Sequence, residues 1–208
     1  MKNNRVLVSV LIVALLSACN RSGTDQQSTT REDSLPVTEQ SIPEPVINYL
    51  ALGKTIATST QAVLAKNLVD AINKSGTEYA LAFCNTKAIA LTDSMSQVLR
   101  ASIKRVTDKP RNPGNQANQN ELIYLEEQKN RLLKGDSAIS AIGEVEGKMI
   151  GYYPIITKAM CLQCHGKKDV NISSTTYATI RKLYPSDNAI GYGENELRGL
   201  WVIEMAKK

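Results

Sequence analysis

Two cysteines and the chain's only histidine lie within five consecutive positions, at Cys161, Cys164 and His165. The spacing C-x-x-C-H is the signature of covalent haem attachment. The two thiols add across the vinyl groups at one edge of a porphyrin to give thioethers, and the next residue offers an imidazole nitrogen to the iron. The motif therefore predicts one haem c, with Cys161 and Cys164 as attachment points and His165 as the proximal metal ligand.

Three other uses of these residues compete with haem attachment. A zinc site could combine Cys84 with the motif, but Cys164 and His165 are adjacent, and neighbouring residues rarely ligate the same tetrahedral ion. A redox-active dithiol is expected in a thioredoxin-like βαβ context, which the sequence does not show. The third alternative is a plain disulfide between Cys161 and Cys164. Haem is favoured because its attachment occurs outside the cytoplasm, and the chain starts like an exported protein.

The residues alone leave the second axial ligand open. A second histidine is excluded, so the donors that remain are Cys84, a methionine, a lysine or none. Cys84 is a lone thiol in an oxidising compartment, where unpaired cysteines are a hazard, but it is equally compatible with a small buried residue on a helix face. Methionine on an apolar stripe is usually core filler, and Met160 abuts the attachment segment on the wrong side. The methionines that remain as candidates are Met95, Met149 and Met205.

The N-terminus has the features of an export signal. A short basic start precedes an apolar run over residues 6–16, which is too short for a stable membrane anchor. The following LSAC, residues 16–19, resembles a bacterial lipoprotein cleavage box, which implies a signal peptide over residues 1–18 and a lipidated Cys19. Plain secretion is the alternative. By lipoprotein sorting patterns, Asn20 in place of Asp favours the outer membrane of a cell that has one.

Residues 19–45 are polar, contain proline and carry few large apolar side chains, so we expect a flexible tether. The tether is acidic, which leaves the domain over residues 46–208 with a mild basic excess within a chain of net charge +5. Basic residues are not interleaved with aromatic ones, so nucleic acid is not an expected partner. The expected partners are haem, the membrane through the lipid, and a protein redox or signalling partner.

Helical periodicity dominates the start of the domain. Residues 63–72 place apolar side chains on one face, Ser75-Gly76 interrupts the pattern, and residues 77–99 predict a second helix. The stripe of this second helix that should be buried consists of Leu81, Cys84, Ala88, Leu91 and Met95.

Short strands and helices follow. The sequence predicts a strand at 100–108, a loop rich in Pro, Gly and Asn, a helix over 120–135 and two strands within 137–156, joined by a turn at VEGKM. A short helix over 175–184 and a closing strand over 199–206 complete the domain. This order indicates an α+β fold in which long helices precede an antiparallel sheet. The β-like closing stretch argues against a four-helix cytochrome.

Several residues near the motif are candidates for the haem pocket. Arginines could pair with haem propionates, and apolar or aromatic residues just before the motif could pack beside the ring, although a solvated strand face and ordinary core packing are the alternatives. The basic candidates are Arg100, Lys104, Arg105 and Arg111, and the packing candidates are Tyr152, Tyr153, Pro154, Ile155 and Ile156.

An ordered set of short motifs resembles one family. The motifs are FCN..AIAL (83–91), RNPGN (111–115), YYPI…CLQCHG (152–166) and YPSDNAIGYGENELRG (184–199), followed by the final strand. Together they resemble the PAS-like c-type haem family first recognised in cyanobacteria and long catalogued as a domain of unknown function. The resemblance covers about residues 46–206. One departure is the stretch KRVTDKPRNPGN, which is longer than the family's usual strand-to-loop join.

The resemblance implies a PAS-like antiparallel sheet after long helices. It also implies one haem held by the histidine of C-x-x-C-H and, unusually, by a cysteine thiolate from the second helix, which maps onto Cys84. A thiolate opposite imidazole predicts a low potential, and its loss on reduction would open a site for NO or CO. The expected function is a redox or gas sensor, with a membrane-tethered electron carrier as the alternative. An enzyme is not expected, because there is no second histidine for a distal pocket.

Overall fold

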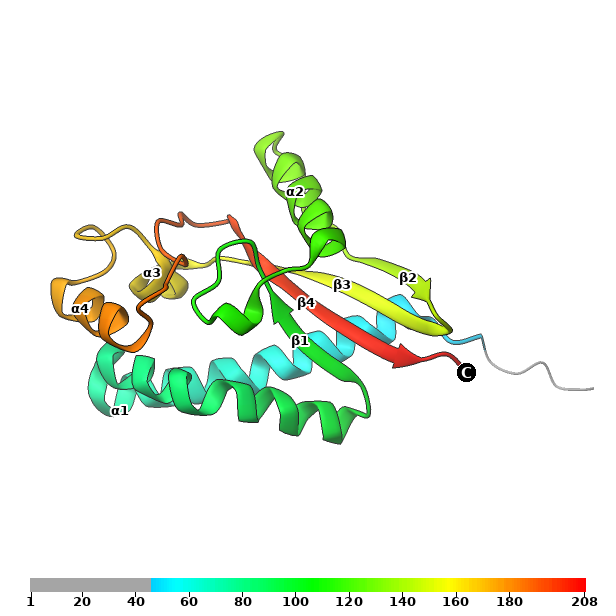
Figure 1. Cartoon of the computed structure of the whole chain (residues 1–208), viewed down its shortest axis with the longest axis horizontal. Helices are drawn as coiled ribbons and strands as arrows, with labels where there is room; N and C mark the ends of the chain where they lie inside the picture. Colours follow the sequence, from blue (N-terminus) through cyan, green and yellow to red (C-terminus); the bar gives the residue numbers. More distant parts are fainter. Residues whose placement is uncertain (1–45) are drawn as a thin grey trace, which may run out of the picture. The chain divides into compact units, whose positions relative to one another are not determined.

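The computed structural model describes residues 46–208. The predicted signal peptide, the lipidated Cys19 and the tether lie outside these residues. Within the described part, a long bent helix precedes a four-stranded antiparallel sheet (Figure 1). The predicted α+β class, with long helices followed by an antiparallel sheet, is confirmed.

The helix α1 (Tyr49–Leu99) consists of two arms that run side by side in opposite directions (Figure 1). Asn48 caps its start by accepting a hydrogen bond from the Ala51 amide at 3.0 Å. The arms are separated at Ser75 and Gly76, and Gly76 has φ 79° and ψ −177°, a conformation that only glycine adopts readily. The predicted break at Ser75-Gly76 is confirmed, although the first arm begins well before residue 63.

The sheet has the strand order β1-β4-β3-β2. The strands are β1 (Ser102–Val106), β2 (Ala141–Val145), β3 (Lys148–Ile156) and β4 (Leu197–Ala206). β2 and β3 form a hairpin whose turn residues, Glu146 and Gly147, have φ values of 49° and 74°. Two consecutive positive φ angles are what a tight hairpin turn requires, so the turn predicted at VEGKM is confirmed.

Both faces of the sheet are covered. Alternate strand residues point to opposite faces, and those packed against α1 include Ile103, Trp201 and Ile203. The other face packs against α2 (Gln119–Leu133), where Leu125 contacts strand residues such as Leu200. The sheet is therefore the middle of three layers, with α1 below it and α2 above it in Figure 1.

Two short helices lie beyond the end of β3. α3 (Ala159–His165) contains the C-x-x-C-H motif, and α4 (Ser174–Leu183) packs against the second arm of α1. The hydroxyls of Thr175 and Thr176 both donate to the Glu78 carboxylate, at 2.7 and 2.8 Å. The sequence predicts α4 but not α3, because seven residues are too few to establish a helical period.

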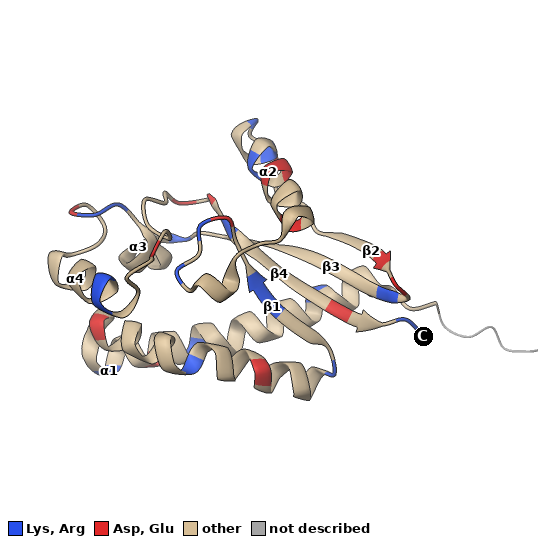
Figure 2. Ribbon diagram, viewed as in Figure 1, with Lys and Arg blue, Asp and Glu red and all other residues tan. Residues whose placement is uncertain are grey.

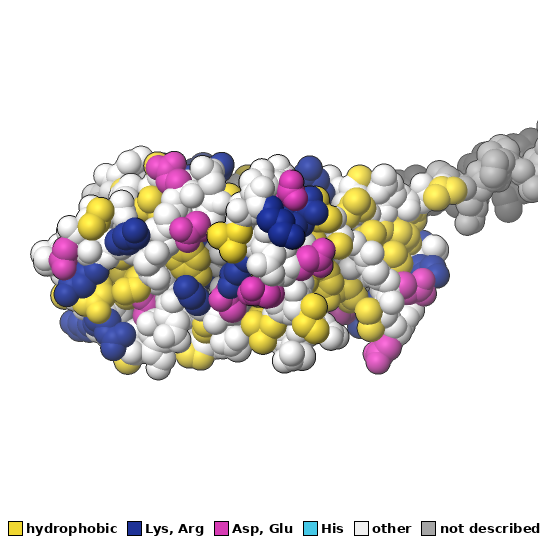
Figure 3. Space-filling model, turned by 90° about the horizontal axis from the view of Figure 1, so that it is seen from above, with side chains coloured by type: hydrophobic (Ala, Val, Ile, Leu, Met, Phe, Trp, Pro, Cys, Tyr) yellow, Lys and Arg dark blue, Asp and Glu magenta, His cyan; other side chains and the backbone are white. Residues whose placement is uncertain are grey.

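The surface of the described domain carries charge of both signs. Basic, acidic and apolar side chains alternate over the face seen from the α2 side (Figure 3). Among residues 46–208, no helix combines the length and apolar character needed to cross a membrane.

α1 approaches the sheet closely at Gly53, and this approach generates a prediction about stability. A Cβ added at Gly53 would collide with the phenol of Tyr153, which donates to the Leu50 carbonyl at 3.1 Å. We expect Gly53→Ala to lower the free energy of unfolding by about 1–3 kcal/mol through overpacking, against a helix-propensity gain of about 1 kcal/mol. Urea unfolding measures the difference.

Gly143→Ala is the matched control, because nothing lies within 4 Å of a Cβ at that position. It should leave stability nearly unchanged. If Gly53→Ala were as stable as this control, the phenol of Tyr153 would be free to move aside and the close approach would not be a constraint.

Candidate functional site

The C-x-x-C-H motif lies on α3, at the end of the sheet beside the second arm of α1 (Figure 1). A helix stacks residues three apart on one side, so Cys161 and Cys164 are successive sulfurs on the same side of α3. Both thiols are free in the structure. His165 is the last residue of the helix, and Gly166 ends it by donating its amide to the Leu162 carbonyl at 2.8 Å.

The imidazole of His165 is held in one orientation. Its Nδ1 lies 2.7 Å from the carbonyl oxygen of Ala189. A carbonyl only accepts hydrogen bonds, so Nδ1 carries the proton and Nε2 keeps the lone pair that a metal needs. Burial, together with the positive charges of Arg198 and Arg111, holds the pKa of His165 well below its usual range. The side chain is therefore a neutral imidazole at physiological pH.

Cys84 lies on the second arm of α1, and α1 contacts α3. Burial raises the pKa of the Cys84 thiol, while the positive charges of Arg105 and Arg111 oppose this shift. Burial likewise raises the pKa of Cys164 to about 11, with a contribution from the charge of Cys84. Cys164 also packs against the cluster to which Leu81, on the same arm of α1 as Cys84, belongs.

Three arginines surround these groups, and their positive charges all act on His165. Arg105 comes from β1, Arg111 from the loop after β1, and Arg198 from β4. Figure 2 shows the basic residues along β1 and in the loop that follows it. Arg111 is compensated by Asp187, with 3.0 Å between Nε and Oδ1.

Arg105 and Arg198 lack such compensation. Among residues 46–208, neither guanidinium has a carboxylate within ion-pair distance. Arg105 lies over the Trp201 ring and Arg198 over the Tyr192 ring, each 5.4 Å from the ring centre. The Nη1 of Arg198 donates to the Thr107 hydroxyl at 3.1 Å, but its Nε is buried without a partner. Burial lowers the pKa of both arginines.

This set of side chains fits a haem. Arg105 and Arg198 are half-buried. A partly desolvated cation without an anion is costly, and the two propionates of a haem would supply the missing negative charges. The thiols of Cys161 and Cys164 match two vinyl groups, and the free Nε2 of His165 matches the iron. The fit is supported by the presence, at one end of the sheet, of both the thiol and imidazole groups of α3 and two arginines without ion-pair partners.

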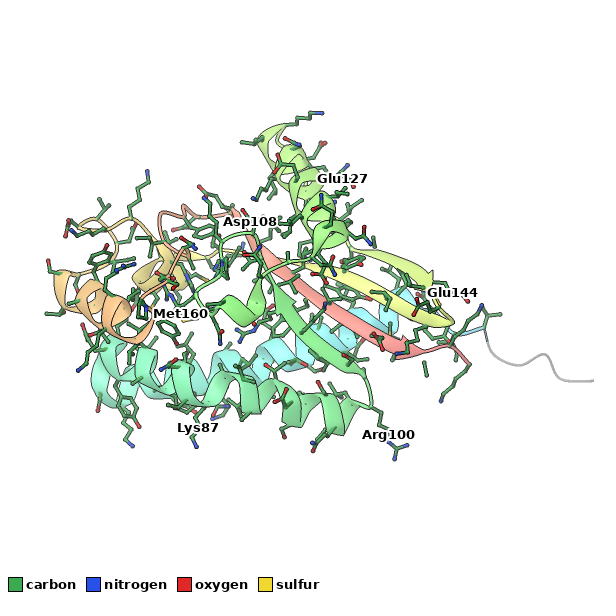
Figure 4. The ribbon with its side chains drawn as sticks, in the orientation of Figure 1. Lys87, Arg100, Asp108, Glu127, Glu144 and Met160 are labelled. Carbon is green, nitrogen blue, oxygen red and sulfur yellow. The ribbon has the colours of Figure 1, made fainter. Side chains whose placement is uncertain are left out.

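Of the other predicted basic residues, Arg100 and Lys104 lie away from the motif and Arg111 reaches it. Arg100 takes a left-handed conformation, with φ 51°, at the end of α1, and its exposed side chain points away from the protein (Figure 4). Lys104 faces the opposite side of β1 from Arg105 and pairs with Glu121 of α2 at 2.7 Å. Arg111 does reach the motif, but as a partner of Asp187 and of the Cys164 carbonyl at 2.6 Å.

The predicted packing residues on β3 are divided between the two faces of the sheet. Tyr153 is buried against the first arm of α1, whereas the Tyr152 ring lies 5.2 Å from that of Tyr124 on the α2 side. Ile155 packs on the α1 side, Ile156 packs on the α2 side, and Pro154 is half-buried opposite Leu200 of β4.

The methionines considered as ligands are part of the core between α1 and the sheet. Met149 and Met205 are opposite each other in the β3–β4 register, and Met95 packs against the same cluster. Met160 is 40% exposed beside the attachment cysteines (Figure 4).

Two residues at the site were not singled out from the sequence. Asp187 and Arg198 both fall within the stretch 184–199 that carries the family resemblance. An arginine at the start of a mostly apolar closing strand was the available signal for Arg198. No local pattern marks Asp187, because its partner, Arg111, is distant in the sequence.

Comparison with known proteins agrees with these observations. The model of the Tll0287-like family matches residues 24–206. The chain belongs to the Tll0287-like family. Among solved structures, the crystal structure of the cyanobacterial heme-protein Tll0287 is similar, with a TM-score of 0.55 and 18% identity, over 78% of this chain and 98% of that chain. At this identity the likeness establishes the Tll0287-like fold, and the family resemblance in the sequence is confirmed. The comparison with curated proteins finds no match.

The uncompensated charge of Arg105 in this Tll0287-like domain generates a second prediction. In the haem-free chain, we expect Arg105→Gln to change the free energy of unfolding by less than about 1 kcal/mol, since only the contact with the Trp201 ring is lost. In the chain matured with haem, the loss should be about 2 kcal/mol, because a hydrogen bond to a carboxylate disappears as well. Urea unfolding of both forms provides the comparison.

Arg111→Gln is the control, since it breaks a buried ion pair that is present without haem and should destabilise both forms by about 3–5 kcal/mol. An equal loss for Arg105→Gln in the two forms would mean that Arg105 gains no anion from haem.

Proposed function

We propose that this Tll0287-like chain is a c-type haem protein of the cell envelope. Cys161 and Cys164 would carry one haem, and His165 and Cys84 would be its axial ligands. The observation that supports this most strongly is the thiol–thiol–imidazole group of α3 beside two arginines without ion-pair partners, with a further free thiol, Cys84, on the helix α1 that contacts α3. The structurally similar Tll0287 is a heme-protein, which is independent support.

Each residue has a defined task in this proposal. His165 would bind the iron through the lone pair of Nε2, because Nδ1–H donates a hydrogen bond to the Ala189 carbonyl. Cys84 lies in the positive field of Arg105 and Arg111, which favours its thiolate form when it donates to a metal. Arg105 and Arg198 would balance the propionates. When bound, haem supplies one-electron redox chemistry and an iron that can take a diatomic ligand.

The role that we favour is a redox or gas sensor. Cys84 belongs to an arm of α1 that starts at the Ser75–Gly76 break, so the helix can bend there without losing the hydrogen bonding of either arm. This arm packs against α4 through Leu81 and is tied to it through Glu78. If Cys84 detaches on reduction, the arm and α4 are the elements that would carry the change to a protein partner.

The alternative is a low-potential electron carrier. Met160, next to the first attachment cysteine, is exposed, so α3 reaches the surface and an electron could enter or leave over a short distance. In either role, the export signal and lipidated Cys19 inferred from the sequence would anchor the domain to a membrane, with the outer membrane favoured. We do not propose an enzymatic activity.

Axial ligation is tested by low-temperature EPR of the ferric protein, produced with haem-maturation machinery. We expect a narrow low-spin signal of the thiolate type in the wild type and its loss in Cys84→Ala, because no other thiol is available to replace it. Met95→Leu is the control and should leave the signal intact, since Met95 packs in the core. A signal that is the same in Cys84→Ala and the wild type would make Cys84 a core residue.

The sensor role is tested by reducing the same protein under CO. We expect a CO-bound absorption spectrum after reduction, because reduced iron binds thiolate more weakly and Cys84 can be displaced. A ferrous protein that keeps its ligands and ignores both CO and NO would instead support the electron carrier, and reversible one-electron cycling would then be expected.

A further inference from the structure

The guanidinium of Arg111 makes several hydrogen bonds beside the C-x-x-C-H motif. Nε and Nη2 donate to the two carboxylate oxygens of Asp187, at 3.0 and 3.3 Å. Nη2 also lies 2.6 Å from the Cys164 carbonyl and 3.5 Å from the Ala189 carbonyl. The side chains of Arg111 and Asp187 are only 10% and 1% exposed. A buried ion pair seldom adds much net stability, so its placement against the motif requires another explanation.

Asp187 connects this pair to the histidine. Its Oδ1 accepts the amide of Ala189 at 3.0 Å, in addition to the Nε of Arg111. The carbonyl of the same Ala189 accepts the Nδ1–H of His165 at 2.7 Å. Both polar groups of Ala189 are therefore fixed, one by the Arg111–Asp187 pair and one by the imidazole. On the other side, the Cys164 carbonyl that Arg111 holds directly precedes His165 in the chain.

We propose that Arg111 and Asp187 are positioning residues for His165. They hold the Ala189 carbonyl and the end of α3 at a fixed distance from each other, which fixes the proton on Nδ1 and the direction of Nε2. This inference rests on the proposed function, in which His165 ligates haem iron. Arg111 would act by positioning His165, whereas Arg105 and Arg198 would pair with the haem propionates.

A well-held Nδ1–H···O=C hydrogen bond makes the imidazole a stronger donor, which favours the ferric state and lowers the reduction potential. Loosening the Ala189 carbonyl should therefore raise the potential, whichever member of the pair is changed. It should also let the imidazole adopt a range of orientations and broaden the ferric EPR signal.

The test compares the reduction potentials of Arg111→Gln and Asp187→Asn in the haem-loaded full chain. If the pair acts through charge alone, the two variants shift the potential in opposite directions, because one leaves a negative charge and the other a positive charge uncompensated. If the pair positions His165, both variants shift it upward, and both EPR signals broaden. Opposite shifts, or no shift in either variant, would overturn the proposal.

Two further variants make the result specific. Arg111→Lys keeps the charge but cannot form the two-pronged contact with Asp187, so it should also raise the potential. Glu121→Gln is the matched control, because Glu121 is 2% exposed and pairs with Lys104 on the opposite face of the sheet. It should lower stability without changing the potential or the EPR signal.

One measurement needs no variant, since His165 is the only histidine. In ferric wild-type protein labelled with [¹⁵N]histidine, the single ring N–H resonance should exchange slowly with solvent. A ring N–H that exchanges freely would contradict the proposal even if the variants failed to fold. Mass spectrometry of the wild type separates the two hypotheses: a chain without covalent haem refutes the proposed function, whereas a haem-loaded chain with a loose histidine refutes only this inference.

Discussion

Positive charge held partly out of water is the constraint on which the arrangement at the end of the sheet depends. Three guanidiniums converge there, and only that of Arg111 has a carboxylate among the described residues. Desolvating a cation without an anion is expensive, so this end of the domain is suited to a ligand that brings its own negative charge. The aromatic rings of Trp201 and Tyr192 offset part of the cost, but their quadrupoles are weak substitutes for an anion.

The same charges set the protonation states around them. Burial and these charges together keep His165 neutral, whereas on Cys84 burial raises the thiol pKa and the arginine charges offset only part of that shift. The arginines belong to the rigid sheet and to the loop after β1, while Cys84 belongs to α1. The arginines that create the positive field can therefore stay in place if α1 moves.

Local features of the fold could be predicted from the sequence. The Ser75-Gly76 break and the turn at 146–147 depend on residues within a few positions of each other, and both were found where expected. The attachment motif was equally local. Arg198 and Asp187 were missed because their positions at the site depend on how β4 pairs with β1 and how the segment before β4 folds back, and neither is encoded in a short pattern. Lys104 and Arg105 show the same limit of prediction from sequence. Both were candidates for the haem pocket, but they point to opposite faces of β1, and the sequence does not say which face lies towards the site.

The strand order has a consequence for how such a chain matures. β4 is the last strand of the chain, yet it lies inside the sheet and pairs with both β1 and β3. Until β4 has been synthesised, β1 has no hydrogen-bonded neighbour in the sheet and Arg198 is absent from the site. The cysteines of α3 precede β4 in the chain, so they emerge while the sheet is still incomplete. If the thiols are joined to haem as proposed, strand order would provide an interval in which they are accessible, and the last residues of the chain would close the site afterwards.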